Sequence, residues 1–180
     1  MGADSAVHTI RQWFQRHLCD NHRVILKLDF ENAFNTVDRA EALRQIREHF
    51  PSLSRWAHWC YGQESRLFFG DYDLASSAGV QQGDPIGPLL FAACIHPLVM
   101  RLDALFRQGH VADPDGLVLF YLDDGILCGD VDTVAAGLRL IQEAAPQLGV
   151  KLKLSKCELI VPGGFCIDND LADKFPRQLL

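Results

Sequence analysis

The 180-residue sequence lacks a run of about 18 apolar residues, the length that a transmembrane helix requires. Residues 1–5 are polar and have neither the basic start nor the apolar stretch of a secretory signal peptide. Internal repeats and low-complexity segments are also missing. We therefore expect an intracellular protein with no membrane partner, and the sequence does not distinguish a nuclear from a cytoplasmic location.

The sequence also lacks paired cysteines and an excess of basic charge. The six cysteines are widely spaced and form no Cys-x-x-Cys pair, so we expect reduced, mostly buried thiols. His17, Cys19 and His22 have a spacing that fits no common structural zinc site and lack a fourth ligand, so we expect no metal there. The net charge of −6 has the wrong sign for a protein that neutralises phosphates. Either the protein does not bind nucleic acid, or its basic surfaces lie on segments outside this chain.

The sequence does contain 48% hydrophobic residues, which is ample for one packed domain. Apolar periodicity predicts helices over residues 7–18, 37–50, 53–61, 88–108 and 130–148. β-rich runs predict strands over residues 23–30, 66–69, 72–76, 117–122, 126–128, 151–154 and 157–161. This order predicts an α+β fold, an antiparallel sheet with helices packed on one face. Thr36 is the expected cap of the second helix, and Pro97 is expected to kink the fourth.

Three carboxylates follow apolar strands. Asp29 lies at the end of the strand at 23–30, and Asp123 and Asp124 lie in a turn between two apolar strands. Carboxylates in such places are costly unless a cation compensates their charge, and Mg²⁺ takes oxygen ligands from one or two carboxylates. If Asp29 and Asp123 lay on adjacent strands, they would hold two Mg²⁺ ions about 3.5–4 Å apart, as in-line phosphoryl transfer requires. Taken alone, the Asp-Asp-Gly segment is more typical of an ordinary hairpin turn.

Four segments in a fixed order resemble the palm domain of reverse transcriptases, especially those of non-long-terminal-repeat retrotransposons. The segments are KLDFENAFN at 27–35, AGVQQGDPIGPLLF at 78–91, FYLDDG at 120–125 and LGVKLKLSKCE at 148–158. A Tyr-x-Asp-Asp match alone would be weak, but four motifs in order, each on its expected type of element, are specific. The resemblance covers residues 23–160 and implies a polymerase palm with an RRM-like or ferredoxin-like core.

The resemblance implies a role for each matching residue. Asp29 and Asp123 would bind two Mg²⁺ ions, for which Mn²⁺ would substitute, and Asp124 would lie close by in a supporting role. The backbone carbonyl of Phe30 would complete the shell of one metal. Lys156 would protonate the leaving pyrophosphate or pair with its charge, and an ordinary solvated lysine remains the alternative.

The resemblance also implies the substrate contacts. The ring of Phe34 would clash with a ribose 2′-hydroxyl and so select deoxynucleotides, and an ordinary core aromatic is the alternative interpretation. Gln82 and Gly83 would line the nucleotide and template pocket, where glycine lets the backbone approach the substrate closely. The implied partners are an RNA template, a DNA primer and a dNTP.

The sequence departs from the family pattern in several places. Asn35 and Ser155 stand where relatives often carry Asp and Asn, and no segment convincingly matches the primer grip, which should begin at 161–165. We predict three regions: a remnant of the fingers or a leader helix at 1–22, the palm at 23–161 and an unassigned tail at 162–180. The expected basic fingers and thumb are missing, which would explain the acidic net charge.

Two kinds of function follow from the sequence. The first is an RNA-directed DNA polymerase palm, incomplete without the fingers and thumb of a full-length polyprotein. The second is a non-catalytic remnant of a decayed retroelement, which folds but does not polymerise. An RNA-directed RNA polymerase shares the palm chemistry, but Phe34 argues against it because such enzymes must accept a 2′-hydroxyl.

Overall fold

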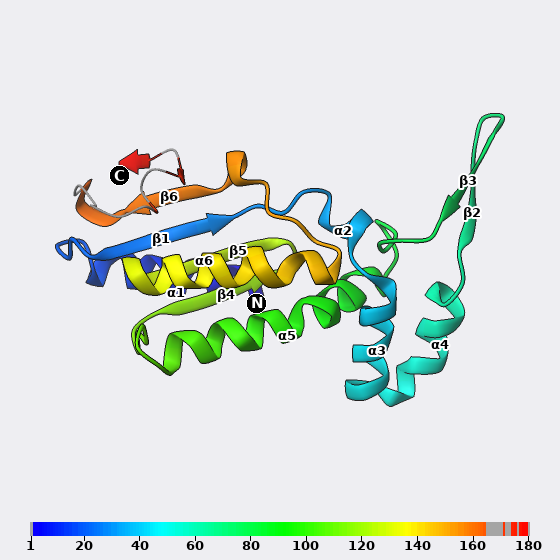
Figure 1. Cartoon of the computed structure of the whole chain (residues 1–180), viewed down its shortest axis with the longest axis horizontal. Helices are drawn as coiled ribbons and strands as arrows, with labels where there is room; N and C mark the ends of the chain where they lie inside the picture. Colours follow the sequence, from blue (N-terminus) through cyan, green and yellow to red (C-terminus); the bar gives the residue numbers. More distant parts are fainter. Residues whose placement is uncertain (1, 165–170, 172–173, 176, 180) are drawn as a thin grey trace. The chain divides into compact units, whose positions relative to one another are not determined.

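The computed structural model describes residues 2–164, 171, 174–175 and 177–179 (Figure 1). The chain divides into two compact units. Unit 1 comprises Met1–Phe30, Leu98–Glu143 and Leu152–Leu180, and unit 2 comprises Glu31–Pro97 and Ala144–Lys151. Each unit is therefore assembled from segments that lie far apart in the sequence.

Unit 1 is built on a five-stranded sheet in the order β4-β5-β1-β6-β7 (Figure 1). Its strands are β1 (Arg23–Leu28), β4 (Leu117–Tyr121), β5 (Asp124–Asp130), β6 (Glu158–Val161) and β7 (Arg177–Leu179). The central strand β1 pairs antiparallel with both β5 and β6, and β4 pairs antiparallel with β5. The parallel pair of β6 and β7 lies at one edge. The predicted antiparallel sheet is thus confirmed, with one parallel edge pair in addition.

One face of this sheet packs against α6 (Val131–Ala144) and against the part of α5 (Gly87–Arg107) that belongs to unit 1, from Leu98 onward. Leu26 of β1 and Leu127 of β5 lie opposite each other on this face and are fully buried. Helix α6 approaches so closely that a Cβ atom at Gly137 would lie 3.1 Å from Leu127 and 3.2 Å from Phe106 of α5. The small residue at 137 therefore allows the helix to lie directly on the sheet.

The other face of the sheet is also covered by a helix. Trp13 of α1 (Gly2–Arg16) is almost fully buried with Ile25 of β1 and Cys128 of β5. Side chains on adjacent positions of a strand point to opposite faces, so Ile25 and Leu26 place α1 and α6 on different sides. The prediction that helices pack on one face only is therefore wrong. Helix α1 has an apolar side of its own, and this side is buried against the second face of the sheet.

Helix α5 is long and apolar enough to cross a membrane, judged by length and composition alone, which the sequence inspection did not predict. Leu98, Leu102 and Phe106 of this helix are buried within unit 1 at helical spacing. A core helix passes the same test of length and composition. Pro97 lies inside the helix, as predicted.

Unit 2 contains α2 (Ala33–Thr36), α3 (Arg39–His49), α4 (Pro51–Tyr61) and a two-stranded hairpin of β2 (Ser65–Phe69) and β3 (Tyr72–Ser76). Gly70 has φ +58° in the turn of this hairpin, a conformation that glycine adopts without strain. The predicted cap at Thr36 is wrong: the Asp38 side chain accepts the Glu41 amide at 2.7 Å. A carboxylate that accepts this amide also suits the positive end of the helix dipole.

Two other predicted elements differ from the structure. The helix predicted over 130–148 ends at Ala144 and continues as the 3₁₀ helix η1 (Ala145–Leu148), because Pro146 has no amide hydrogen to extend the α-helix. The strand predicted over 151–154 is reduced to one bridge, between Phe30 and Leu152. A 3₁₀ helix, η2 (Leu154–Lys156), then turns the chain before β6.

Five of the cysteines lie within the described residues, and all five are free thiols. Cys94, Cys128 and Cys157 are buried, Cys60 is half-buried and Cys19 is exposed. Burial raises the pKa of Cys94 and of Cys128 to about 12, so both stay protonated at neutral pH. Three of these five thiols are buried, as expected, and Cys166 lies outside the described residues.

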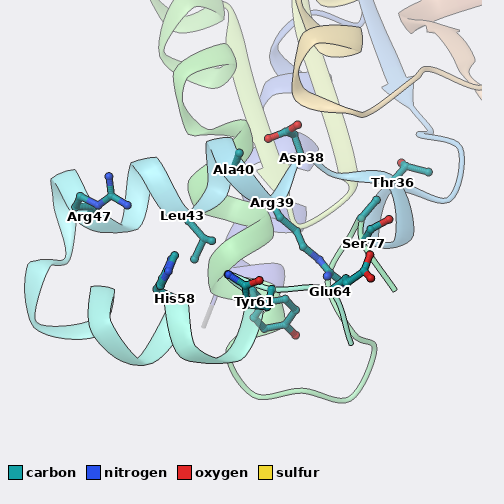
Figure 2. A pocket seen from close by; sticks show the side chains of 13 residues that line it. Thr36, Asp38, Arg39, Ala40, Leu43, Arg47, His58, Tyr61, Glu64 and Ser77 are labelled. Atoms are coloured by element: carbon teal, nitrogen blue, oxygen red, sulfur yellow. The ribbon is translucent and has the colours of Figure 1, made fainter. Parts of the chain in front are cut away.

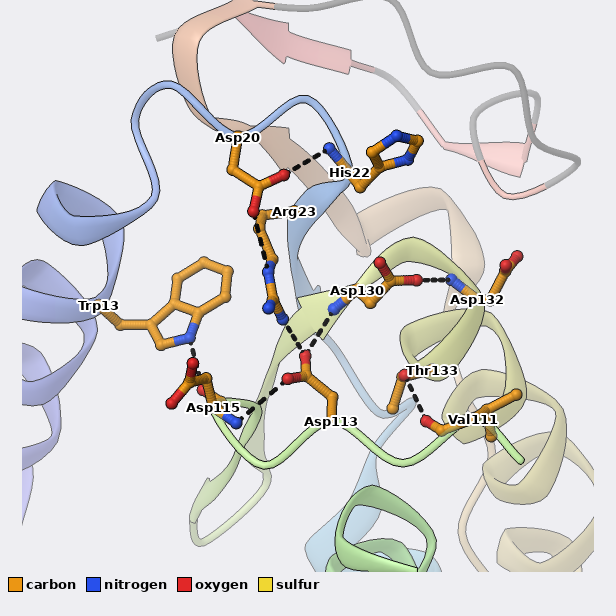
Figure 3. A network of polar contacts seen from close by, with 10 residues as sticks. All are labelled: Trp13, Asp20, His22, Arg23, Val111, Asp113, Asp115, Asp130, Asp132 and Thr133. Carbon is orange, nitrogen blue, oxygen red and sulfur yellow. Dashed lines mark hydrogen bonds and ion pairs between the residues drawn. The ribbon is translucent and has the colours of Figure 1, made fainter. Parts of the chain in front are cut away.

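An ion pair between Arg23 and the buried Asp113 connects segments of unit 1 at the Arg23 end of β1 (Figure 3). Asp113 is only 4% exposed and accepts hydrogen bonds from the guanidinium of Arg23 and from the backbone amide of Asp130 at 2.8 Å. Its second oxygen accepts the amide of Asp115 at 3.1 Å, and the indole of Trp13 donates to the carbonyl of Asp115 at 2.7 Å. One carboxylate thus joins β1, β5 and the loop that holds α1.

The Arg23→Met variant should lower the free energy of unfolding by about 3–5 kcal/mol, because it leaves the Asp113 carboxylate buried without a cation. Urea denaturation followed by circular dichroism measures this change. Arg107→Met is the matched control, since the pair of Arg107 and Asp103 is exposed and contributes little. Equal destabilisation by the two variants would contradict the importance of the buried pair.

Candidate functional site

The predicted metal residues of unit 1 lie at one end of the neighbouring strands β1 and β5. Leu28, the last residue of β1, pairs with Gly125 of β5, so one further step of the register sets Asp29 opposite Asp124. Opposed residues in an antiparallel ladder have Cα atoms about 4.5–5.5 Å apart. The fold therefore places Asp29 and Asp124 at the same end of the paired strands β1 and β5, although more than half of the chain separates them.

Asp123 lies in the two-residue turn between β4 and β5. Tyr121 pairs with Asp124, which leaves Leu122 and Asp123 as the turn residues. Leu122 has φ +56°, a conformation that bulky residues rarely adopt and that type II′ hairpin turns require at this position. Strained residues of this kind persist where the surrounding structure determines them, and they concentrate at functional sites.

The three carboxylates have no cationic partner within the described part of the chain. All seven ion pairs found there involve other residues. Asp29 and Asp123 are half-buried and Asp124 is exposed. Half-buried carboxylates that lack a basic neighbour have the donor chemistry for a hard divalent cation.

The carboxylates would not hold such a cation by themselves. Among the described residues, no three His, Cys, Asp or Glu side chains converge closely enough to bind an ion. The other ligands would have to be backbone carbonyls, waters or phosphate oxygens, as is usual for Mg²⁺. The residues fit an ion that binds together with a phosphate-bearing substrate.

The backbone of Phe30 is placed to supply one such carbonyl. Phe30 forms a bridge with Leu152, but the hydrogen bonds of this bridge run from Glu31 N to Lys151 O and from Lys153 N to Asp29 O, each 2.8 Å long. Neither bond uses the amide or the carbonyl of Phe30. The carbonyl predicted as a metal ligand is therefore not engaged in the ladder.

The turn that carries Lys156 is bound to the backbone of Asp29. Lys156 is exposed at the end of η2, and its amide donates to the carbonyl of Lys153 at 2.8 Å. The sulfur of Cys157, which is fully buried, accepts the amide of Asp29 at 3.4 Å and contacts the carbonyl of Lys153 at 3.6 Å. The sequence analysis missed Cys157, whose only signal was its position beside Lys156 in the last motif.

The predicted substrate residues lie in unit 2. The half-buried ring of Phe34 stacks on Phe91, with ring centroids 4.7 Å apart and an interplanar angle of 10°. The carbonyl of Phe34 accepts the amide of Val80 at 2.6 Å, at the start of the loop that contains Gln82 and Gly83. The structure therefore brings Phe34 and this loop together through the backbone.

The loop has buried ends and an exposed tip. Val80 and Ile86 are each 3% exposed, whereas Gln82 and Gly83 are exposed. Gly79 has φ +69°, and a Cβ atom there would lie 2.3 Å from the backbone of Asn35. Only glycine permits this close approach. The loop is anchored on α2 and presents its tip outward.

Three further side chains hold this loop, and the sequence analysis missed all of them: Arg39 of α3, Tyr61 of α4 and Asp84 of the loop itself. Arg39 and Tyr61 also line a pocket of about 480 Å³ next to α3 and α4 (Figure 2). Arg39 is a cation that is only 9% exposed, which sequence patterns do not predict.

Comparison with known proteins supports one family. The sequence profile of the family described as "Reverse transcriptase (RNA-dependent DNA polymerase)" matches residues 4–173. The Retrovirus-related Pol polyprotein from type-1 retrotransposable element R2 of Nasonia vitripennis is 28% identical over 148 residues. That match covers 76% of this chain and 14% of the polyprotein, so the chain spans only a small part of this relative.

Solved structures share the fold at low sequence identity. Apo telomerase from Candida tropicalis has a TM-score of 0.67 and 14% identity, covering 89% of this chain and 32% of that chain. Telomerase from Candida albicans, in complex with the TWJ fragment of telomeric RNA, has a TM-score of 0.61 and 11% identity, covering 87% and 30%. These likenesses show the fold, the α+β palm of a polymerase.

The close approach at Gly79 can be tested against the open position at Gly83. Gly79→Ala should lower the free energy of unfolding by about 2–5 kcal/mol, because it adds a backbone clash to the strain of a positive φ. Gly83→Ala should cost only about 1–2 kcal/mol, since φ is +87° but no atom lies within 4 Å of the added Cβ. Thermal and urea unfolding measure both values, and equal losses would contradict the predicted contact with Asn35.

Proposed function

The chain belongs to the reverse transcriptase family, of the non-long-terminal-repeat retrotransposon type, and we propose that it is the palm of an active RNA-directed DNA polymerase. The proposed reaction joins a primer 3′-hydroxyl to the α-phosphate of a dNTP on an RNA template. One O–P bond forms, the bond between the α- and β-phosphates breaks, and pyrophosphate leaves. The complete reaction would also need basic fingers and a thumb from other segments of a longer polyprotein.

One observation carries this proposal. Asp29, Asp123 and Asp124 lie at the same end of the neighbouring strands β1 and β5, and no basic side chain among the described residues pairs with them. An ordinary Asp-Gly hairpin turn would not need a third carboxylate from a distant strand beside it. Paired carboxylates on adjacent strands are the arrangement that in-line phosphoryl transfer uses.

Reverse transcriptases in general use divalent metals, and we propose two Mg²⁺ ions at this site, with Mn²⁺ as a substitute. Such ions would neutralise the charge that develops on the transferred phosphate. Asp29 and Asp123 would hold them, with Asp124 in support and the carbonyl of Phe30 as a further ligand. Lys156 would donate a proton to the departing pyrophosphate from the turn bound to Asp29.

Unit 2 would supply the nucleotide contacts. The exposed tip of Gln82 and Gly83 is available to a nucleotide, and the open space at Gly83 permits close backbone approach. Phe34 would exclude a ribose 2′-hydroxyl, and its stacking on Phe91 holds the ring in one orientation. The Candida albicans telomerase was solved with an RNA fragment, which supports an RNA partner for this chain as well.

Primer extension on poly(rA)/oligo(dT) tests the proposed activity directly. We expect extension with Mg²⁺ or Mn²⁺ by a longer polyprotein that carries this chain together with fingers and a thumb. Its Asp123→Ala variant should lose at least a hundredfold, on the order of the loss when electrostatic stabilisation of a transition state is removed. Asp71→Ala, in the hairpin turn of unit 2, is the matched control and should keep full activity. No extension by that longer polyprotein would favour the non-catalytic remnant.

Phe34→Ala should raise incorporation of ribonucleotides relative to deoxynucleotides by about tenfold or more, because it removes the proposed clash with the 2′-hydroxyl. Single-nucleotide extension with dTTP and UTP measures the ratio. Phe34→Tyr keeps the bulk of the ring and should keep the discrimination. Unchanged sugar selection in Phe34→Ala would rule out this role for the ring.

A further inference from the structure

A buried arginine binds the start of the loop that carries Gln82 and Gly83. Arg39 donates from Nε to the carbonyl of Gly79 at 2.6 Å and from Nη1 to the carbonyl of Ser76, also at 2.6 Å. Its Nη2 donates to the hydroxyl of Ser76 at 2.8 Å. The guanidinium lies 5.4 Å from the centre of the Tyr61 ring, within the range of a cation–π contact.

Tyr61 connects the two sides of the loop through one hydroxyl group. The ring is 4% exposed, and its hydroxyl donates to a carboxylate oxygen of Asp84 and accepts the amide of Gln81 at 3.2 Å. Burial, helped by the bond to Asp84, raises the pKa of Tyr61 to about 12, so the hydroxyl keeps the proton that it donates. The other oxygen of Asp84 accepts the amide of Ile86 at 3.1 Å.

These contacts fall on both sides of the tip, whose residues Gln82 and Gly83 are exposed. Gly79 and Gln81 are bound before it, and Asp84 and Ile86 are bound after it. At Gly83 itself, an added Cβ would meet no atom within 4 Å. The anchors, rather than any packing of the tip, therefore determine where the tip lies.

We propose that Arg39, Tyr61 and Asp84 are positioning residues that hold Gln82 and Gly83 in the geometry that binds the incoming nucleotide. This inference rests on the proposed function of the loop. Tyr61 is the central member, because its single hydroxyl bonds the residue before the tip and the residue after it. A network that served stability alone would not need to end on both flanks of an exposed tip.

The Tyr61→Phe variant isolates this connection, since it removes the hydroxyl and keeps the ring beneath Arg39. Amide hydrogen exchange of the whole chain, followed by NMR, should show exchange at Gln81 that is about tenfold faster. The amide of Val80, bound to the Phe34 carbonyl, is the internal reference and should not change. Tyr72→Phe, on the exposed hairpin, is the matched control.

Nucleotide binding is the second readout, one that a merely structural role would not change. Chemical-shift titration with dATP and Mg²⁺ should give a dissociation constant about fivefold higher in Tyr61→Phe than in the parent chain. Asp84→Asn provides a second variant that changes the same bond from the loop side, and it should raise exchange and weaken dATP binding in the same way. Tyr72→Phe should leave both measurements unchanged.

Each outcome separates the inference from the function on which it rests. Unchanged exchange at Gln81 in both variants would show that the network does not hold the loop. Faster exchange with unaltered dATP affinity would show that the loop is held for some purpose other than nucleotide binding. No binding of dATP by the parent chain would instead count against the proposed function of the loop.

Discussion

The pairing of β1 with β5 is the constraint on which the carboxylate site depends. Its register sets Leu28 opposite Gly125 and so brings Asp29 next to the turn that contains Asp123. A slip of one residue would move every side chain of β1 to the opposite face and separate the carboxylates. The alternation of buried Leu26 and Leu28 with the opposite-facing Ile25 and Lys27 prevents that slip, because one set must face α5 and α6.

At the end of the sheet that carries the carboxylates, two features lower the stability of the fold. Leu122 is strained there, and three carboxylates lie together without a cationic side chain among the described residues. The contacts at the opposite end of the sheet stabilise the fold. There Asp113 is buried with Arg23 and satisfies two backbone amides, and Trp13 secures α1 through the same loop. The stabilising contacts at one end of the sheet offset the cost of placing three carboxylates at the other end.

The two units divide the proposed chemistry between them. The carboxylates, the Phe30 carbonyl and Lys156 belong to unit 1, whereas Phe34 and the loop of Gln82 and Gly83 belong to unit 2. Each set is organised by backbone hydrogen bonds: Lys153 and Cys157 bind the backbone of Asp29, and Val80 binds the carbonyl of Phe34. In unit 2, Gln82 and Gly83 are exposed, whereas Val80 at the start of their loop is buried.

Features that depend on the order of neighbouring residues could be predicted from the sequence. The strand that ends at Asp29 and the hairpin turn that contains Asp123 both follow from local apolar runs and turn residues, and four motifs in order identify the family. Alternation and turn preference act within a few residues, so they can be read along the chain.

The folded structure was needed to show which distant residues meet. It placed α1 on the second face of the sheet, and it replaced a predicted strand with the turn that joins Lys156 to Asp29. It also assembled Arg39, Tyr61 and Asp84 around the loop of Gln82 and Gly83, although they come from two helices and the loop itself. No local pattern marks these residues, because burying a charge or a hydroxyl depends on partners that only the folded chain provides.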